Sequence, residues 1–469
     1  MRAAALLLLL TSAPALAETL TLDEAVRMAR AHHPTVEQQR GQVIVAGGRR
    51  EQALAKLLPS LQGSFGYVPQ TSNLVATPQL TRELITSTGQ DHVVDAAGVN
   101  TLVTCRTPGV GNCMPLPAAP TSWALQNFWT MQVGLSWTLF DWGTSIYGYK
   151  SARRVVAAAE VGVHTAQRNV VLDAKVAFFT ALAAEEQLVV SRDAVRTYAA
   201  HVEQTRAFHD TGLRTGIDVA TVESALASAG FTLARAVAAR ETARAALAAA
   251  LGEDHPPDWQ LVADPNLFDF RPDDTQRTVT SEDTLTDVAL RQRTELTELR
   301  LQETSAVDLV KAARGAYLPA LTLNAGPSWA AGSLADLTPN LTFTIAIGYP
   351  TSGMSPLAVH GQVREAEGNV AITRAQVRAE RDAIRQDVVG GRAQLAAARE
   401  EMLAAVTAVK TAARQRELAE GRYSNGVGNV IELEDALLTD VNARFQLVQA
   451  RLDIATARAR LQHALGEDN

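Results

Sequence analysis

The sequence is poor in the residues that carry most protein chemistry. It holds two cysteines, six methionines and nine histidines in 469 residues. His32 and His33 are adjacent and so lie on different sides of a helix, and the other histidines form no ligand spacing with cysteines or acids. A phosphate-binding Gly-Lys-Ser/Thr loop and a nucleophile elbow are both missing. The sequence therefore predicts no enzyme, no metal site and no cofactor.

Long apolar runs and a surplus of basic charge are also missing. The formal net charge is -7, and lysines and arginines are scattered, so no basic patch typical of nucleic-acid binding is present. After the N-terminal segment, no run approaches the roughly 20 apolar residues of a transmembrane helix. We expect no nucleic-acid partner, and any membrane crossing would have to use β-strands.

The first residues have the three parts of a secretory signal. Arg2 precedes an apolar stretch at 3–10, and Ala15 and Ala17 form a small-x-small cleavage site. We expect 1–17 to be a signal peptide that exports the chain. No cysteine follows the cleavage site, which predicts a free N-terminus and no lipid anchor.

The two cysteines lie close together in the sequence. Cys105 and Cys113 belong to a segment rich in Pro, Gly and Thr, which in an exported protein favours a local disulfide. Two free thiols in a loop are the alternative.

The chain repeats itself. No proline occurs between Pro120 and Pro256 or after Pro356, and both stretches are rich in Ala, Arg, Glu, Leu and Val, which favours long helices. With a shift of 214 residues the two stretches match without a gap, so that Gly212 falls on Gly426. We interpret the chain as an internal duplication.

The predicted organisation follows from this duplication. It consists of the signal peptide 1–17, a first repeat 18–252, a connector 253–282 and a second repeat 283–469. The first repeat is expected to contain strands at about 61–68 and 129–140 and long helices at about 143–208 and 217–251. The second is expected to contain strands at about 320–329 and 341–349 and long helices at about 357–423 and 431–466.

The long helices have the spacing of coiled-coil seams. In the second copy apolar residues recur in heptads, at Val370, Val377, Ile384, Val388, Leu395, Met402 and Val409 and at Leu438, Val441, Phe445, Val448, Leu452, Ala455 and Ala459. In the first copy the expected seam is alanine, at Ala227, Ala234, Ala238 and Ala245. Glycine-bearing turns at 210–216 and 424–429 predict antiparallel hairpins. A helix from about Ser151 to Phe208 alone would be about 85 Å long at 1.5 Å per residue, longer than an ordinary globular core.

The segments between the helices change to a period of two, as in Trp129, Met131, Val133, Leu135, Trp137 and Leu139 and again in Leu341, Phe343, Ile345, Ile347 and Tyr349. Strands of about ten residues with this alternation are typical of a transmembrane β-barrel. Four strands are too few to close, because about eight is the practical minimum, and a membrane cannot accommodate an unpaired edge. We expect three copies, the smallest number that leaves an aqueous lumen. In such a barrel the long segment 69–121 should be an extracellular loop. A soluble β-sandwich attached to a coiled coil is the alternative.

Four segments carry a resemblance to the TolC family of outer-membrane efflux proteins. They are Leu20-Thr21-Leu22-Asp23-Glu24-Ala25-Val26, Leu58-Pro59-Ser60, Trp137-Thr138-Leu139-Phe140-Asp141-Trp142-Gly143 and the stretch from Gly421 to Ala436. The resemblance implies a chain that is mainly α with a small β part, built of duplicated helix-strand-strand-helix-helix repeats. It implies a homotrimer with a long antiparallel coiled-coil helical barrel and a twelve-stranded transmembrane β-barrel, four strands from each chain.

The resemblance also implies a periplasmic gate. In the family a Tyr and an Arg near the second hairpin turn bond an Asp near the first, and two acid rings narrow the mouth. By position, the Tyr falls on Tyr423, its Asp partner on Asp218, and the acid rings on Glu432 and Asp435. The Arg position is Gly428 here, and Arg214 is a candidate substitute cation or a solvated turn residue.

Two interpretations of the acids stay open on the residues alone. Three-fold symmetry would gather Glu432 and Asp435 around one axis, where carboxylates attract cations. Acids in the first turn of a helix, Asp218 among them, also complement the helix dipole.

The expected function is a passive outer-membrane exit duct for small molecules in a Gram-negative bacterium. Its expected partners are a periplasmic membrane-fusion adaptor, an inner-membrane pump of the RND or ABC type, and outer-membrane lipid. Adaptor docking is expected at the hairpin turns, at Gly212, Leu213, Arg214, Gly216, Gly426, Val427 and Gly428. The alternatives are a duct for type I protein secretion, a metal-ion efflux duct, which the few methionines disfavour, and a periplasmic structural coiled coil.

Overall fold

A computed structural model describes most of the chain. The described residues are 19–71, 90–94, 100–105, 113–115, 125–254, 259–262, 268, 277, 280–331, 333–349 and 356–467. The expected signal peptide 1–17 lies outside them. The chain forms two compact units, and each combines parts of both sequence repeats. One consists of residues 51–149 and 311–363, and the other of 1–50, 150–310 and 364–469.

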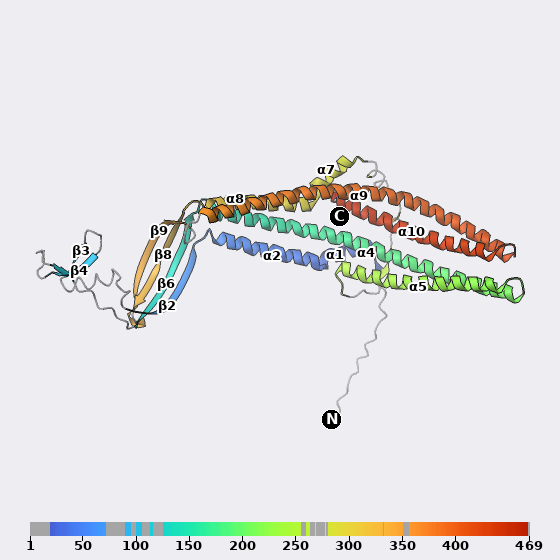
Figure 1. The fold of residues 1–469 in the computed structure, drawn as a ribbon, viewed down its shortest axis with the longest axis horizontal. Helices are drawn as coiled ribbons and strands as arrows, with labels where there is room; N and C mark the ends of the chain where they lie inside the picture. Colours follow the sequence, from blue (N-terminus) through green and yellow to red (C-terminus); the bar gives the residue numbers. More distant parts are fainter. Residues whose placement is uncertain are drawn as a thin grey trace, which may run out of the picture. The chain divides into compact units, whose positions relative to one another are not determined.

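The first of these units is built on a four-stranded antiparallel sheet (Figure 1). Its strands are β2 (Ser60–Thr71), β6 (Leu125–Phe140), β8 (Ala320–Ala331) and β9 (Thr338–Gly348), in the order β2-β6-β8-β9. Strands β2 and β9 are therefore the edges, and neither edge has a partner among the described strands of this chain.

The sheet has one apolar and one polar face. Residues directly opposite in neighbouring strands share a face, and the ladder aligns Leu61, Leu135, Ala325 and Phe343 in one row. The adjacent row on the other face is Ser60, Ser136, Asn324 and Thr344. The apolar side chains of β9 remain exposed, at 63–75% for Leu341, Phe343, Ile345 and Ile347.

A sharp turn joins the sheet to the helix that follows it. Trp142 and Gly143 have positive φ angles of 55° and 92°, and the Asp141 carboxylate accepts from the backbone N–H groups of Gly143 and Ser145, at 3.2 and 2.7 Å. The Trp142 indole N–H donates to the Pro319 carbonyl at 3.0 Å. The two bonds to the Asp141 carboxylate satisfy backbone donors at the first turn of the helix, which would otherwise have no partner.

Part of the predicted long loop contains strands. They are β3 (Gln90–Val94), β4 (Asn100–Cys105) and β5 (Cys113–Pro115), which form a small antiparallel sheet. Cys105 lies directly opposite Cys113 in its ladder. Opposite residues of an antiparallel pair have Cα atoms about 4.5–5.5 Å apart, within disulfide range. The disulfide itself stays a prediction, because the two side chains lie outside the described part.

The other unit is helical. Its short helices are α1 (Leu22–His32), α2 (Pro34–Ala55), α7 (Glu282–Gln292) and α8 (Thr294–Gly315). Its long helices are α4 (Thr144–Asp210), α5 (Gly216–Leu251), α9 (Pro356–Ser424) and α10 (Val430–Leu465), which form the hairpins α4–α5 and α9–α10 (Figure 1). Strands β1 (Thr19–Leu20) and β7 (Gln260–Leu261) pair in parallel beside them.

The helix seams correct the predicted register in two places. In α5 the expected alanines, Ala227, Ala234, Ala238 and Ala245, are all exposed, and the buried heptad is Val222, Ala229, Ala236 and Ala243. In α10 the predicted seam is buried only in part: Leu438 is 54% exposed, whereas Val448, Ala455 and Ala459 are buried. A second buried heptad is Ala436, Ala443, Ala450 and Ala457. These two heptads coincide under the shift of 214 residues. Small side chains at these positions let the helix backbones approach closely.

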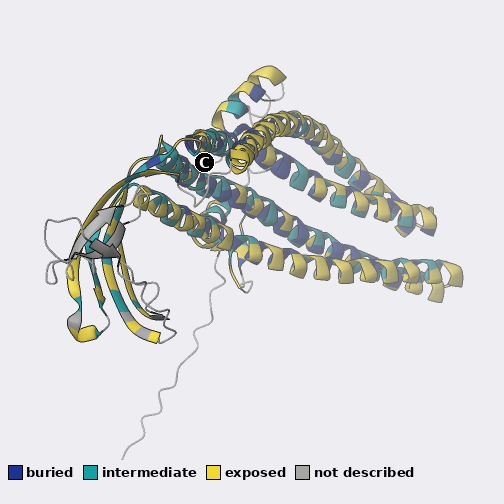
Figure 2. Cartoon of the chain, turned by 60° about the vertical axis from the view of Figure 1, so that its left-hand side comes forward, coloured by how far each residue is buried: buried dark blue, intermediate teal, exposed yellow. Residues whose placement is uncertain are grey.

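Helix α5 is both apolar and largely exposed. Among the described helices it alone contains an 18-residue window with mean hydropathy of 1.2 or more and at most two charged residues, and 6% of that window is buried. Figure 2 shows α5 mostly in the colour of exposed residues. The criterion is met through alanine rather than through large apolar side chains.

Candidate gate at the helix hairpin turns

The two hairpin turns have the same backbone design. Gly212 and Gly426 end α4 and α9 with φ angles of 81° and 73°. After each glycine a backbone N–H reaches back five residues, from Leu213 to the Phe208 carbonyl at 2.8 Å and from Val427 to the Arg422 carbonyl at 3.0 Å. This is a glycine-terminated helix end in which the last carbonyls are satisfied. The predicted glycine turns are thus formed by left-handed glycines.

Tyr423, on the second hairpin, is buried against the first. Its side chain is 1% exposed, and its hydroxyl lies 2.8 Å from Oγ1 of Thr205, which is 0% exposed. Its ring lies 6.0 Å from the Phe208 ring. These contacts belong to an apolar cluster that includes Val202, Val222, Val430, Leu433 and Leu437. The end of α9 is therefore held to the end of α4.

Arg214 makes a second connection between the hairpins. Its Nη2 donates to the Gly428 carbonyl at 2.8 Å, and its guanidinium carbon lies 4.4 Å from the centre of the Tyr423 ring. A guanidinium over an aromatic face is stabilised by the ring quadrupole. Arg214 is thus not a solvated turn residue: its cation belongs to the first hairpin, and both of its partners belong to the second.

Gly428 fits this contact because it has no side chain. A Cβ at this position would lie 2.8 Å from the Tyr423 nitrogen and 3.0 Å from the Arg422 carbonyl carbon. The Gly428 N–H also donates to the Arg422 carbonyl at 2.9 Å. An arginine at position 428 would therefore have to open the turn that holds the Gly428 carbonyl.

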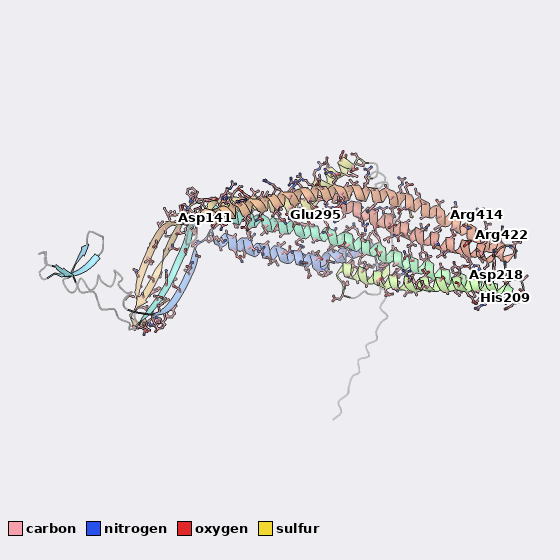
Figure 3. The ribbon with its side chains drawn as sticks, in the orientation of Figure 1. Asp141, His209, Asp218, Glu295, Arg414 and Arg422 are labelled. Atoms are coloured by element: carbon pink, nitrogen blue, oxygen red, sulfur yellow. The ribbon has the colours of Figure 1, made fainter. Side chains whose placement is uncertain are left out.

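The expected hydrogen bond between Tyr423 and Asp218 is not formed among the described residues, which corrects the prediction. Asp218 instead accepts from the Thr215 N–H at 3.0 Å and from Thr215 Oγ1 at 2.9 Å, a capping box at the start of α5. The backbone N–H groups of a first turn need such acceptors, so the local cap takes the carboxylate. Thr205 takes the tyrosine hydroxyl. Figure 3 labels Asp218 on the first hairpin and Arg422 on the second.

The two acid-ring candidates differ in their surroundings. Glu432 pairs with Arg422 across its own hairpin, with Nε and Oε1 3.3 Å apart. Asp435 is exposed, and its backbone carbonyl accepts from Thr439. The N-cap of α10 is Asn429, whose side chain accepts from the Ile431 N–H. Neither acid is needed as a cap.

Apolar side chains protrude from both turns at matching positions. Leu213 and Val427 are each 72% exposed, and Ile217 and Ile431 are 74% and 58% exposed. The members of each pair are separated by the shift of 214 residues. Gly216 begins α5 beside them. These turns therefore present the same apolar pattern twice.

Sequence reasoning missed two residues of this region. Thr205 has no distinctive pattern, because threonine is common on helices. Glu434 lies next to Asp435 on α10, and burial together with the charge of Asp435 raises its pKa to about 7. Helical periodicity places Glu434 on a different face of α10 from Glu432. It does not show that this face lies against the first hairpin. Within the described residues, no group of three His, Cys, Asp or Glu could hold a metal ion.

The comparison with protein families matches the model described as outer membrane efflux protein at residues 118–253 and 285–467. These two segments cover both hairpins and most of the sheet. The chain belongs to the outer membrane efflux protein family. Members of this family are channels, so family membership supports the prediction that the chain is not an enzyme. A search of curated proteins by sequence gives no match.

Solved structures show the same fold at low identity. The CmeC outer membrane channel of Campylobacter jejuni superposes with a TM-score of 0.76 and 16% identity, covering 95% of this chain and 86% of CmeC. The outer membrane protein VceC of Vibrio cholerae gives 0.71 and 18%, covering 95% and 96%. The open state of the MtrE outer membrane channel of Neisseria gonorrhoeae gives 0.70 and 17%, covering 95% and 88%. The prediction of a mainly helical chain with a small strand part is confirmed.

Proposed function

We propose that this efflux-family chain is one third of a passive exit duct for small molecules in the outer membrane of a Gram-negative bacterium. The observation that carries the proposal is the four-stranded sheet, with one apolar exposed face, one polar face and two unpaired edges. In a membrane the apolar face meets lipid and the polar face lines water. Every edge must then be paired, because hydrocarbon offers no hydrogen bonds.

Three copies satisfy these requirements. Strand β9 of one copy pairs with β2 of the next, which gives a closed barrel of twelve strands. A barrel of about eight strands is filled by its own side chains, so two copies would leave no lumen. The helical hairpins of the three copies then form the periplasmic part of a homotrimer. Exposed alanines of α5 would be covered by a neighbouring copy.

The partners follow from the passive design. A passive duct takes its energy from an inner-membrane pump, of the RND or ABC type, through a periplasmic adaptor. The matching exposed apolar residues Leu213, Val427, Ile217 and Ile431 support the hairpin turns as the docking surface. Export by residues 1–17, without lipidation, completes this assignment. Type I protein secretion and metal-ion efflux stay the alternatives within transport.

The assignment predicts a conducting trimer. The purified chain should cross-link as a trimer in detergent and give single-channel currents in planar bilayers, whereas a structural coiled coil gives none. Phe343→Arg places a charge on the apolar face of β9 and should prevent insertion, since a midplane arginine costs about 2–4 kcal/mol.

The matched control is the next residue of the same strand. Thr344 lies on the polar face, so Thr344→Arg should insert and conduct, with reduced cation preference. Equal effects of the two substitutions, or a monomer without currents, would contradict the proposed orientation of the sheet.

The acids near the start of α10 are expected to set ion preference. Glu432→Gln together with Asp435→Asn should lower the ratio of cation to anion permeability roughly severalfold, because carboxylates repeated around a narrow axis attract cations. Of the two single substitutions, Asp435→Asn should lower this ratio more than Glu432→Gln, since Glu432 is already paired with Arg422. Reversal potentials in asymmetric KCl measure this ratio. An unchanged reversal potential in the double variant would show that neither acid lines the pore.

A further inference from the structure

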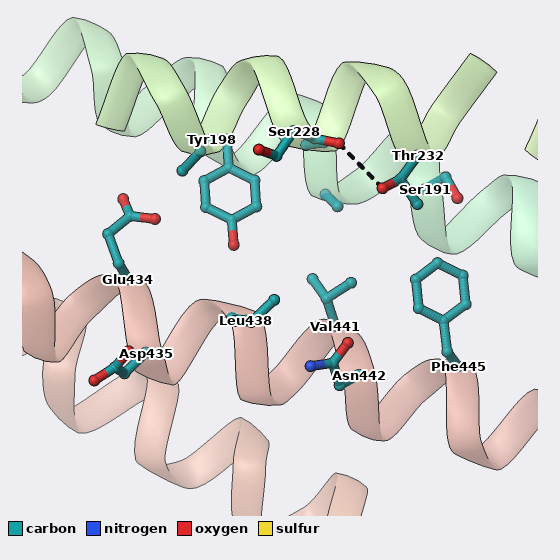
Figure 4. A pocket seen from close by; sticks show the side chains of 13 residues that line it. Ser191, Tyr198, Ser228, Thr232, Glu434, Asp435, Leu438, Val441, Asn442 and Phe445 are labelled. Atoms are coloured by element: carbon teal, nitrogen blue, oxygen red, sulfur yellow. Dashed lines mark hydrogen bonds between the residues drawn. The ribbon is translucent and has the colours of Figure 1, made fainter. Parts of the chain in front are cut away.

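A pocket lies between the two hairpins, farther from the hairpin turns than the contact of Tyr423 with Thr205. It is bounded by α4, α5 and α10 and has a volume of about 300 Å³ (Figure 4). Small-molecule sites begin at roughly this volume. Its walls are mainly apolar, with Ala194, Ala225, Ala229, Leu438 and Val441 among them. The space is therefore suited to a small ligand with an apolar part.

The charged side chains that line the pocket are all acidic. Its lining contains Glu434 and Asp435 but no Lys, Arg or His. Glu434 Oε1 is buried and has no hydrogen-bond partner among the residues that the structure describes. Figure 4 shows the Glu434 and Tyr198 side chains reaching toward one another across the space between α10 and α4.

The hydroxyl groups of the lining strengthen this character. Ser191, Ser228 and Thr232 each donate to a backbone carbonyl one turn earlier in their own helices, at 2.9, 3.1 and 3.0 Å. A hydroxyl has a single proton, so these three present only oxygen lone pairs to the pocket. Tyr198 and Phe445 add aromatic rings, whose faces also attract cations.

We propose that this pocket binds a small organic cation, an ammonium group bearing an apolar substituent, with Glu434 as its counter-ion. The half-buried Glu434 carboxylate, whose Oε1 is fully buried, supplies the charge. The rings and alanines receive the apolar part, and the hydroxyl oxygens accept the remaining hydrogen bonds. A metal ion would need several convergent charged ligands, which the pocket does not offer. The proposal is independent of the conducting role, because binding is measured on purified protein.

Protonation of Glu434 competes with the cation. Burial raises the pKa of Glu434 to about 7, so the acid is ionised above this pH and neutral below it. The lining groups facing it are Asp435 on the same helix and Tyr198 on α4, while α5 contributes no titratable side chain. Burial and the charge of Glu434 raise the pKa of Tyr198 to about 12, so that the tyrosine stays neutral. A bound cation favours the ionised acid, lowers its pKa and releases a proton.

Calorimetry with benzyltrimethylammonium, a cation that cannot titrate, tests the site on the full chain in a nonionic detergent. We expect binding at pH 8, weakening up to about tenfold for each pH unit below 7. At pH 7 the apparent enthalpy should depend on the ionisation enthalpy of the buffer, because a proton is released. The neutral isostere neopentylbenzene should bind more weakly.

Two variants and one control assign the site. Glu434→Gln keeps the shape and should weaken binding about tenfold or more, equivalent to one charged contact. Ser228→Phe should fill the pocket and so weaken binding, while leaving the Glu434 carboxylate in place. Glu417→Gln, an exposed acid on α9, is the matched control and should leave the affinity unchanged. No binding by the unsubstituted chain, equal affinity in Glu434→Gln, or equal weakening in Glu417→Gln would overturn the proposal.

Discussion

Arg214→Ala is expected to raise the single-channel conductance of the purified trimer in planar bilayers. The substitution removes the hydrogen bond from Nη2 to the Gly428 carbonyl and the contact with the Tyr423 ring. A hydrogen bond from a charged group contributes about 1.5–3 kcal/mol, and partial exposure reduces this toward the lower end. A loss of about 1.4 kcal/mol per chain changes the ratio of joined to separated hairpins about tenfold.

Matched variants distinguish loss of the contact between Arg214 and the second hairpin, here called the latch, from general loosening of the hairpin. Arg206 pairs with Glu223 at 2.6 Å within the first hairpin, so Arg206→Ala removes the same side chain without cutting the link to the second. Its conductance should stay close to that of the unsubstituted chain. Arg214→Lys keeps the charge but loses the planar fork, and should be intermediate. Conductance raised equally by Arg206→Ala and Arg214→Ala would contradict a specific latch.

Tyr423→Phe should act in the same direction with a smaller effect. It removes the hydroxyl that lies 2.8 Å from Thr205 Oγ1 and keeps the ring beneath Arg214. Asp218→Ala should act differently, because Asp218 caps its own helix and does not reach Tyr423. Its main effect should be loss of helix stability of about 1 kcal/mol.

Replacing both turn glycines with valine should abolish export while the trimer stays in the membrane. Gly212 and Gly426 have φ angles of 81° and 73°, a region that costs an L residue about 1–2 kcal/mol and a β-branched residue more. Open space surrounds both positions, so strain rather than collision is the cause. The turns should rearrange and displace Leu213 and Val427, which protrude from them.

Asparagine provides the matched control for this prediction. It is close to valine in size but tolerates the left-handed region, so the Gly212→Asn and Gly426→Asn pair should keep export. Export is measured as whole-cell accumulation of a dye that cells with the unsubstituted chain keep out, and the trimer is measured in outer-membrane fractions. Normal export by the valine pair would remove the turns from the docking surface.

The sequence anticipated the elements of the fold because their periods are local. Alternation at Trp129, Met131 and Val133 favours a strand, and a proline-free heptad pattern favours a long helix. The observed strands β6 and β9 and helices α4 and α9 lie within a few residues of the predicted bounds. The division into repeats remains a proposal, since the compact units combine parts of both copies.

The helix register was less predictable. Each long helix carries more than one alanine stripe, and composition alone does not say which stripe meets a partner within the chain. Ala229 and Ala236 are buried, whereas Ala227 and Ala234 are exposed. Only the packing of one hairpin against the other distinguishes them, because burial depends on which residues of distant segments come together.

The sequence by itself predicted an export signal, the alternation of the strands, the two glycine turns and the family likeness. The tertiary structure decided which acid caps a helix, which tyrosine partner is used, and that Arg214 of one hairpin binds Gly428 of the other. The physical reason is range: capping, turns and periodicity act over a few residues of one chain segment, whereas the Arg214 contact and the Glu434 pocket join residues more than two hundred positions apart.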